Sequence, residues 1–149
     1  MSVKRSQRFK PIHNLAVQRE DMAAQTLGRT QRALSEHNTK LSELTNYYHD
    51  YVKRFTEQAE KGMSITQVQS YQNFIAQLEL AIAEQKTQII RMTETCNSRR
   101  LDWTIQRKKS QVLEKVMTRY QNKEQQNDNR KEQRLADEFV ANRYWHKKS

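Results

Sequence analysis

Apolar side chains recur along the first part of the chain with alternating spacings of three and four residues, a pattern typical of a coiled coil. From Leu27 onward, two sets of positions each repeat every seven residues. The first set, named a, is Leu27, Leu34, Leu41, Tyr48 and Phe55, and the second, named d, is Thr30, His37, Leu44, Tyr51 and Gln58. The pattern predicts a long helix with one narrow apolar face.

This first pattern stops at the stretch "EKGMS" and a second one begins after it. Gly62 can adopt the left-handed conformation that ends a helix, and Ser64 can cap the next helix. In the second pattern the a positions are Val68, Ile75, Ile82, Ile89, Cys96 and Trp103, and the d positions are Tyr71, Leu78, Gln85, Met92 and Arg99. The spacing fades through "RRLDWTIQRKKSQ", returns weakly at Leu113, Val116, Met117 and Tyr120, and is partly regained in the final segment "LADEFVANRYWHKKS".

The two patterns predict an all-α fold in which two long helices form an antiparallel coiled-coil hairpin, because a tight connection folds each apolar stripe onto the other. The second helix is expected to overhang the first, so that residues beyond about 110 have no intramolecular partner. We expect one coiled-coil domain over residues 1–149, with helices over about 12–60 and 64–143, a turn at 61–63, and a segment 121–149 that can be disordered alone.

Composition agrees with a thin structure, because only 35% of the 149 residues are hydrophobic and 30% are charged. Two glycines and one proline are too few for a fold built from many short elements. The chain has no apolar run long enough to span a membrane and no signal-peptide pattern at its start. We therefore expect a cytoplasmic protein without membrane insertion, in which the single Cys96 serves packing.

Positive charge is concentrated at the two ends of the sequence. The net charge is +4 for residues 1–20, −1 for 21–96 and +7 for 97–149. In a hairpin, the first and last segments lie at the same end, which is then basic. A solvated face is the simpler interpretation of any single cation, and a nucleic-acid binder stays an alternative that steep salt dependence would support. The sequence has no zinc-finger spacing, RNP-like motif or glycine-rich phosphate loop.

An excess of aromatic residues lies beside the predicted seam, in the stretch "LSELTNYYHDYVKRF". Tyr48 and Phe55 occupy a positions and are explained by packing, whereas Tyr47 falls at g, together with Phe74 and Ala81 on the second helix. The g positions of two antiparallel helices flank the same side of the seam. Since two helices provide no third layer, these residues are expected to form a partly exposed patch that binds a protein.

No arrangement of residues indicates catalysis or a metal site. The four histidines are scattered, and two helices cannot enclose an active site that excludes water. His37, at a d position, is interpreted as a packed and hydrogen-bonded seam residue. We therefore expect no enzyme activity, no catalytic or metal-binding residues, no cofactor and no small-molecule substrate.

The chain resembles the FliJ family of flagellar type III export proteins along nearly its full length. The resemblance includes "AAQTLG" at 23–28, "LTNYYHDYVKR" at 44–54 and "SYQNFIAQLELAI" at 70–82. The most specific part is a YQxFIxxLExAI-like run that begins at Tyr71. At Lys40 and Gln85, where relatives can carry Gln and His, the sequence departs from the family, so no gate contact is assigned to those two.

The resemblance implies a stalk similar to that of rotary ATPases, whose paired termini enter and stimulate the hexameric export ATPase FliI. It also implies contact with the cytoplasmic domain of the export gate protein FlhA, handling of export chaperones, and a peripheral place at the cytoplasmic face of the inner membrane. The residues that match family gate contacts are Leu44, Tyr47, Tyr51, Phe74, Leu78 and Ala81. The basic residues expected against the ATPase ring are Arg8, Lys10, Arg107, Lys108, Lys109, Lys115 and Arg119.

Two alternatives share the predicted helices. One is the equivalent stalk of a virulence injectisome, which the heptads cannot distinguish, although the tyrosine and YQxFI-like runs favour the flagellar form. The other is a cytoskeletal coiled coil, which would self-associate through long continuous seams and is disfavoured by the single short hairpin.

Overall fold

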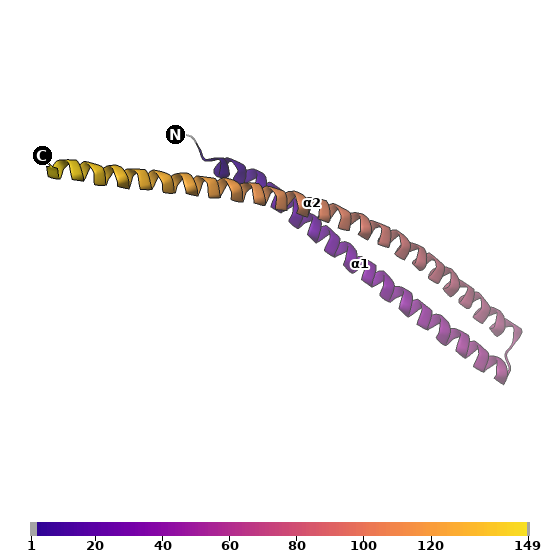
Figure 1. Ribbon diagram of the computed structural model, residues 1–149. Helices are drawn as coiled ribbons and strands as arrows, with labels where there is room; N and C mark the ends of the chain where they lie inside the picture. The colour runs from indigo at the N-terminus through magenta and orange to yellow at the C-terminus, as the bar shows by residue number, and fades with distance from the viewer. Residues whose placement is uncertain (1–2, 149) are drawn as a thin grey trace. The chain divides into compact units, whose positions relative to one another are not determined.

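The computed structural model describes residues 3–148, and two helices account for nearly all of them (Figure 1). Helix α1 runs over Arg5–Lys61 and helix α2 over Ile65–Lys148, with no strand in the described residues. The predicted all-α hairpin is confirmed. Helix α1 begins at Arg5, seven residues before the expected start near residue 12, so Pro11 lies inside the helix and not just before it.

The turn between the helices uses the two residues that the sequence singled out. Gly62 has a φ of 94°, and its N–H donates to the carbonyl of Ala59 at 3.3 Å, which ends α1. The hydroxyl of Ser64 accepts the N–H of Gln67 at 3.2 Å, while the Gln67 side chain accepts the N–H of Ser64 at 3.2 Å. This reciprocal capping box starts α2 and confirms the predicted cap.

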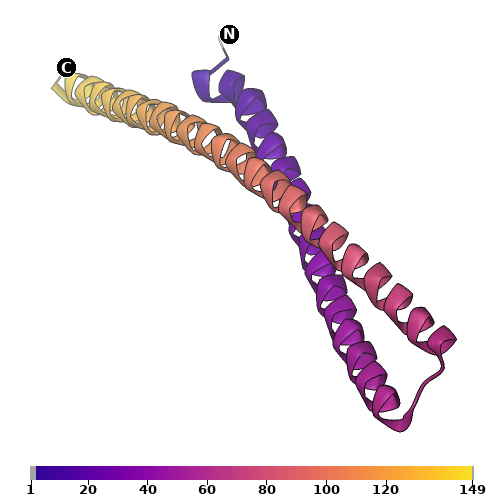
Figure 2. The same ribbon diagram turned by 90° about the vertical axis from the view of Figure 1, so that its right-hand side faces the viewer.

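The chain divides into two compact units, and each helix contributes to both. Residues 23–103 form the hairpin unit, in which the two arms run antiparallel on either side of the turn (Figure 2). The terminal unit consists of residues 3–22 of the N-terminal segment and 104–148 of α2, so far as the structure describes it.

The core of the hairpin unit follows the predicted heptad. Leu27, Leu78 and Cys96 are no more than 9% exposed, and Cys96 is the most buried at 3%. Gln85, also at a d position, is buried and donates from Nε2 to the carbonyl of His37 at 2.9 Å, with His37 Nδ1 at 3.0 Å. The predictions that Cys96 packs and that His37 is a hydrogen-bonded seam residue are confirmed.

In the terminal unit, pairing between the helices continues well past residue 110. Ser110 is 5% exposed, the ring of Phe9 meets that of Tyr120 edge-on at 5.8 Å, and Lys4 forms an ion pair with Asp128 at 3.0 Å. The expectation that residues beyond about 110 have no intramolecular partner is therefore wrong. The heptad continues there, but Ser110 and Glu124 occupy a positions among the apolar ones, so small and polar residues interrupt the apolar spacing.

Beyond Asp128, α2 continues to Lys148 with exposed side chains throughout positions 129–147. This stretch carries five exposed large apolar residues, which are Leu135, Phe139, Val140, Tyr144 and Trp145. Whether segment 121–149 is ordered in isolation stays a prediction, and Ser149 lies outside the described residues. Within residues 3–148, neither helix has a stretch apolar and long enough to cross a membrane.

Candidate protein-binding surfaces

A cluster of aromatic rings joins the two helices of the hairpin unit. Tyr51 lies at its centre, with its ring centroid 4.3 Å from that of Phe74 and 5.5 Å from that of Tyr71. Tyr47 stacks on Tyr51 from the outer side at 6.3 Å and 19° between ring planes, and it remains 57% exposed. Phe55 completes the cluster through Tyr71 at 5.6 Å. Tyr47 is thus packed against Tyr51 on one face of its ring and otherwise mostly exposed.

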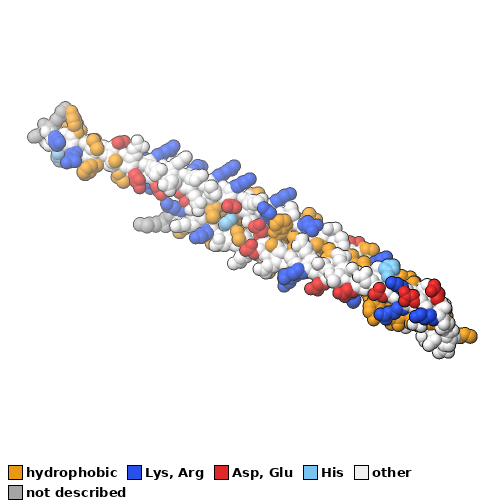
Figure 3. All heavy atoms as spheres, turned by 90° about the horizontal axis from the view of Figure 1, so that it is seen from below, with side chains coloured by type: hydrophobic (Ala, Val, Ile, Leu, Met, Phe, Trp, Pro, Cys, Tyr) orange, Lys and Arg blue, Asp and Glu red, His pale blue; other side chains and the backbone are white. Residues whose placement is uncertain are grey.

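The three aliphatic residues of the predicted gate surface occupy different depths. Leu78 is 8% exposed and belongs to the seam. Leu44 and Ala81 are half-buried and line a shallow hollow beside Lys40 and Gln85. The hairpin unit therefore holds all six predicted gate residues, with Tyr47 as the outermost and Leu78 as structural support. Figure 3 shows orange side chains between charged ones near the turn end of the face in view.

Tyr48 differs sharply from its neighbour Tyr47. Its hydroxyl donates to the carboxylate of Glu79 at 3.2 Å, which raises the pKa of Tyr48, first through this hydrogen bond and then through the negative charge of Glu79. Half-buried Tyr48 connects the two helices, as expected for an a residue. Gln85, which is not among the predicted gate residues, is occupied by its bonds to His37.

The basic residues predicted to face an ATPase ring all lie on the surface of the terminal unit. Arg8 and Lys10 are exposed on α1, and the five from α2 are exposed as well: Arg107, Lys108, Lys109, Lys115 and Arg119. The terminal unit contains 17 Lys and Arg against 8 Asp and Glu, a net charge of +9, whereas the hairpin unit contains 10 against 9, a net charge of +1. The basic end predicted from the first and last segments of the sequence therefore corresponds to the terminal unit.

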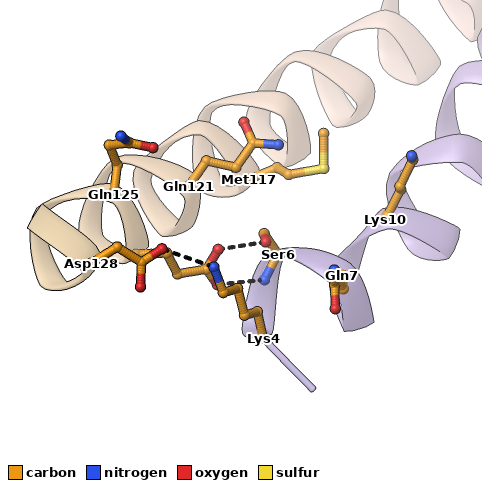
Figure 4. A pocket seen from close by; sticks show the side chains of 9 residues that line it. Lys4, Ser6, Gln7, Lys10, Met117, Gln121, Gln125 and Asp128 are labelled. Carbon is orange, nitrogen blue, oxygen red and sulfur yellow. Dashed lines mark hydrogen bonds and ion pairs between the residues drawn. The ribbon is translucent and has the colours of Figure 1, made fainter. Parts of the chain in front are cut away.

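The start of α1 is hydrogen-bonded to the carboxylate of Glu124 on α2. Glu124 accepts the N–H of Ser6 at 3.1 Å and the Ser6 hydroxyl at 2.6 Å, and Lys4 pairs with Asp128 nearby (Figure 4). Glu124 thereby satisfies an N–H of the first turn, which has no partner within its own helix. These hydrogen bonds from Ser6, more than the charge of Lys4, hold the pKa of Glu124 below its ordinary value. The sequence did not reveal this contact.

Sequence reasoning also missed an apolar groove in the terminal unit. Ile12 and Leu15 of α1 and Val112 of α2 line it, and Arg19, Lys108 and Lys109 stand at its edges. The sequence does contain a sign of this groove, because Ile12 lies at a g position and Leu15 and Val112 lie at c positions. In an ordinary two-stranded coiled coil, these positions carry polar residues. Among residues 3–148, no group of three or more His, Cys, Asp or Glu side chains could hold a metal ion.

Comparison with known proteins assigns the family. The family model described as "Flagellar FliJ protein" matches residues 5–149. A flagellar FliJ protein of Salmonella typhi is 25% identical over 132 residues, which cover 89% of this chain and 90% of that protein. The FliJ protein of Escherichia coli K12 is 24% identical over 129 residues, covering 87% and 88%. No solved structure matches the chain. Because the family model spans almost all of it, this chain belongs to the FliJ family and is a flagellar protein related to export.

Proposed function

We propose that the protein is a non-enzymatic stalk of the flagellar export apparatus, which enters and stimulates the hexameric export ATPase and contacts the export gate. The observation that carries this proposal is the division of surface chemistry between the units. A net charge of +9 in the terminal unit suits an acidic protein partner, whereas the hairpin unit offers exposed aromatic area at a net charge of +1.

The terminal unit would enter the ATPase ring. Its two helices form a narrow, densely cationic pair, and electrostatic attraction speeds and orients the docking of such a surface. The exposed cations from Arg8 to Arg119 named above would make these contacts. Export chaperones and a peripheral place at the cytoplasmic face of the inner membrane belong to the same proposal.

The hairpin unit would bind the gate protein FlhA through the aromatic cluster. Tyr47 and Phe74 would contact the partner, with Tyr51 holding both rings and Leu78 supporting them from the seam. Tyr is frequent among residues that dominate binding energy, because it brings a large rigid ring and a polar tip.

One experiment with paired variants tests both contacts. We expect Tyr47→Ala with Phe74→Ala to weaken gate binding about tenfold or more while ATPase stimulation persists. Lys115→Glu with Arg119→Glu should instead reduce stimulation and leave gate affinity unchanged. Steady-state ATP hydrolysis over a concentration series and calorimetric titration of the gate domain provide the measurements.

Leu80→Ala is the control for the aromatic variant, because Leu80 is 72% exposed on α2 and lies outside the cluster. Circular dichroism establishes equal helicity. If the unmodified protein leaves its ATPase unstimulated at every concentration, the stalk proposal is wrong. If gate affinity is unchanged in the helical aromatic variant, the gate surface lies elsewhere.

A further inference from the structure

The apolar groove of the terminal unit has the chemistry of a helix-binding site. Its walls are Ile12, Leu15 and Val112, which are 52%, 48% and 59% exposed. The half-buried side chains of Ala16 and Leu113 form the floor. Ala16 is a small residue at a d position, so it leaves room in the floor for an incoming side chain.

The dimensions of the groove suit a helix lying along both α1 and α2. The lining residues extend over positions 12–19 of α1 and 106–113 of α2. At 1.5 Å per residue, each wall is about 10 Å long, or about two helical turns. Two parallel walls with an apolar floor are what a third helix requires in order to bury an i, i+3, i+4 and i+7 stripe.

Charge decides what kind of helix fits. Arg19, Lys108 and Lys109 line the groove, and no Asp or Glu is among its lining residues. Because every charged residue that lines the groove is a cation, a second basic surface is disfavoured, and acidic residues on either side of the partner's apolar stripe are favoured. We propose that this groove binds an amphipathic helix of another protein whose apolar stripe is flanked by acidic side chains.

This binding site goes beyond the stalk role, because its apolar walls and its helical partner are not part of that role, although Lys108 and Lys109 are shared with the proposed ATPase contacts. A second copy of this chain fits poorly as occupant. The exposed apolar stretch near the C-terminus is bordered by Arg134 and Arg143 as well as by acids, and the terminal unit as a whole carries a net charge of +9.

The test uses the full chain and a labelled synthetic helix of about 15 residues, with a Leu stripe flanked by Glu. Its twin has Lys in place of every Glu. At physiological salt, fluorescence anisotropy should show the acidic peptide binding at least about tenfold more tightly than the twin. We expect Lys108→Glu with Lys109→Glu to weaken binding about tenfold, and Ile12→Gln with Val112→Gln to weaken it similarly.

Two matched controls separate the groove from general attraction. Lys115→Glu with Arg119→Glu makes the same change in net charge outside the groove, and Leu135→Gln with Phe139→Gln removes exposed apolar area elsewhere. Both should retain affinity within about twofold. A photoreactive group on the Leu stripe should crosslink to residues 12–19 and 106–113, as read by mass spectrometry.

Three results would overturn the inference. Equal binding of the two peptides would show that charge does not select the partner. If the groove variants and the control variants weakened peptide binding equally, the affinity would depend on net charge and not on the groove. A dimer by light scattering that Ile12→Gln with Val112→Gln disperses would make a second copy the occupant.

Discussion

The hairpin unit and the terminal unit share one heptad geometry, but they differ in the residues that are buried along the seam. In the hairpin unit the most buried seam residues are apolar, as Leu27, Leu78 and Cys96 show, with Gln85 as the exception. In the terminal unit the buried positions are Ser6 and Ser110, and contacts between the helices include an ion pair and a carboxylate cap. The difference shows that pairing can persist along a coiled coil after the apolar stripe has thinned.

The two seams should therefore contribute differently to stability and specificity. Burial of apolar area stabilises in proportion to that area, so the hairpin unit should provide most of the free energy of unfolding. Hydrogen bonds such as Ser6 to Glu124 contribute less net energy, but they fix which residues face each other. The terminal unit is then expected to open more easily than the hairpin unit, which suits its proposed docking into an ATPase ring.

The largest expected effect compares one leucine from each seam. We expect Leu78→Ala to lower the free energy of unfolding by about 2 to 3 kcal/mol, because the side chain is 8% exposed and leaves a cavity. Leu113→Ala in the terminal unit should lower it by about 1 kcal/mol, since Leu113 is half-buried. Urea unfolding followed by circular dichroism measures both. Equal losses would remove the proposed difference between the units.

A smaller effect concerns the polar exception in the hairpin seam. Gln85→Ala should lower stability by about 1 to 2 kcal/mol, because it removes the hydrogen bonds to His37 and some packing. Gln85→Leu should lower stability less than Gln85→Ala, since Leu restores apolar packing at this d position although it leaves His37 without its partner. If Gln85→Leu is as damaging as Gln85→Ala in thermal unfolding, the pair is required for stability as well as register.

The two units also differ in how far the sequence could predict them. In the hairpin unit, Leu and Ile at a and d predicted the helices, and Gly62 and Ser64 predicted the turn. The g position of Tyr47 predicted partial exposure, and its side chain is 57% exposed. These features depend on local conformation and on apolar periodicity, both of which are visible in one chain.

The pairing of the helices in the terminal unit is harder to predict from the sequence, because it depends on long-range polar contacts. Nothing in the composition near Ser6 or Glu124 indicates that they meet, since 118 residues separate them along the sequence. Once the helices continue in register from the turn, the same heptad places Ser6, Ser110 and Glu124 on the seam. Extending the register through polar residues would have found the pairing, and it would have corrected the start of α1.

The smallest effect isolates the carboxylate cap at Glu124. Because its folded-state pKa is lowered, its contribution is present above its ordinary value of 4.5 and is lost as the pH falls through the folded pKa. We expect the first turn of α1 to fray as the pH falls below about 4.5, and Glu124→Gln to fray that turn even at neutral pH and to flatten the response. Chemical shifts of residues 5–10 in an NMR pH titration measure it. Asp128→Asn is the matched control, because it removes the half-exposed Lys4 pair and leaves the cap in place. If the pH dependence of these chemical shifts persisted in Glu124→Gln, another acidic residue would be the cause of the fraying.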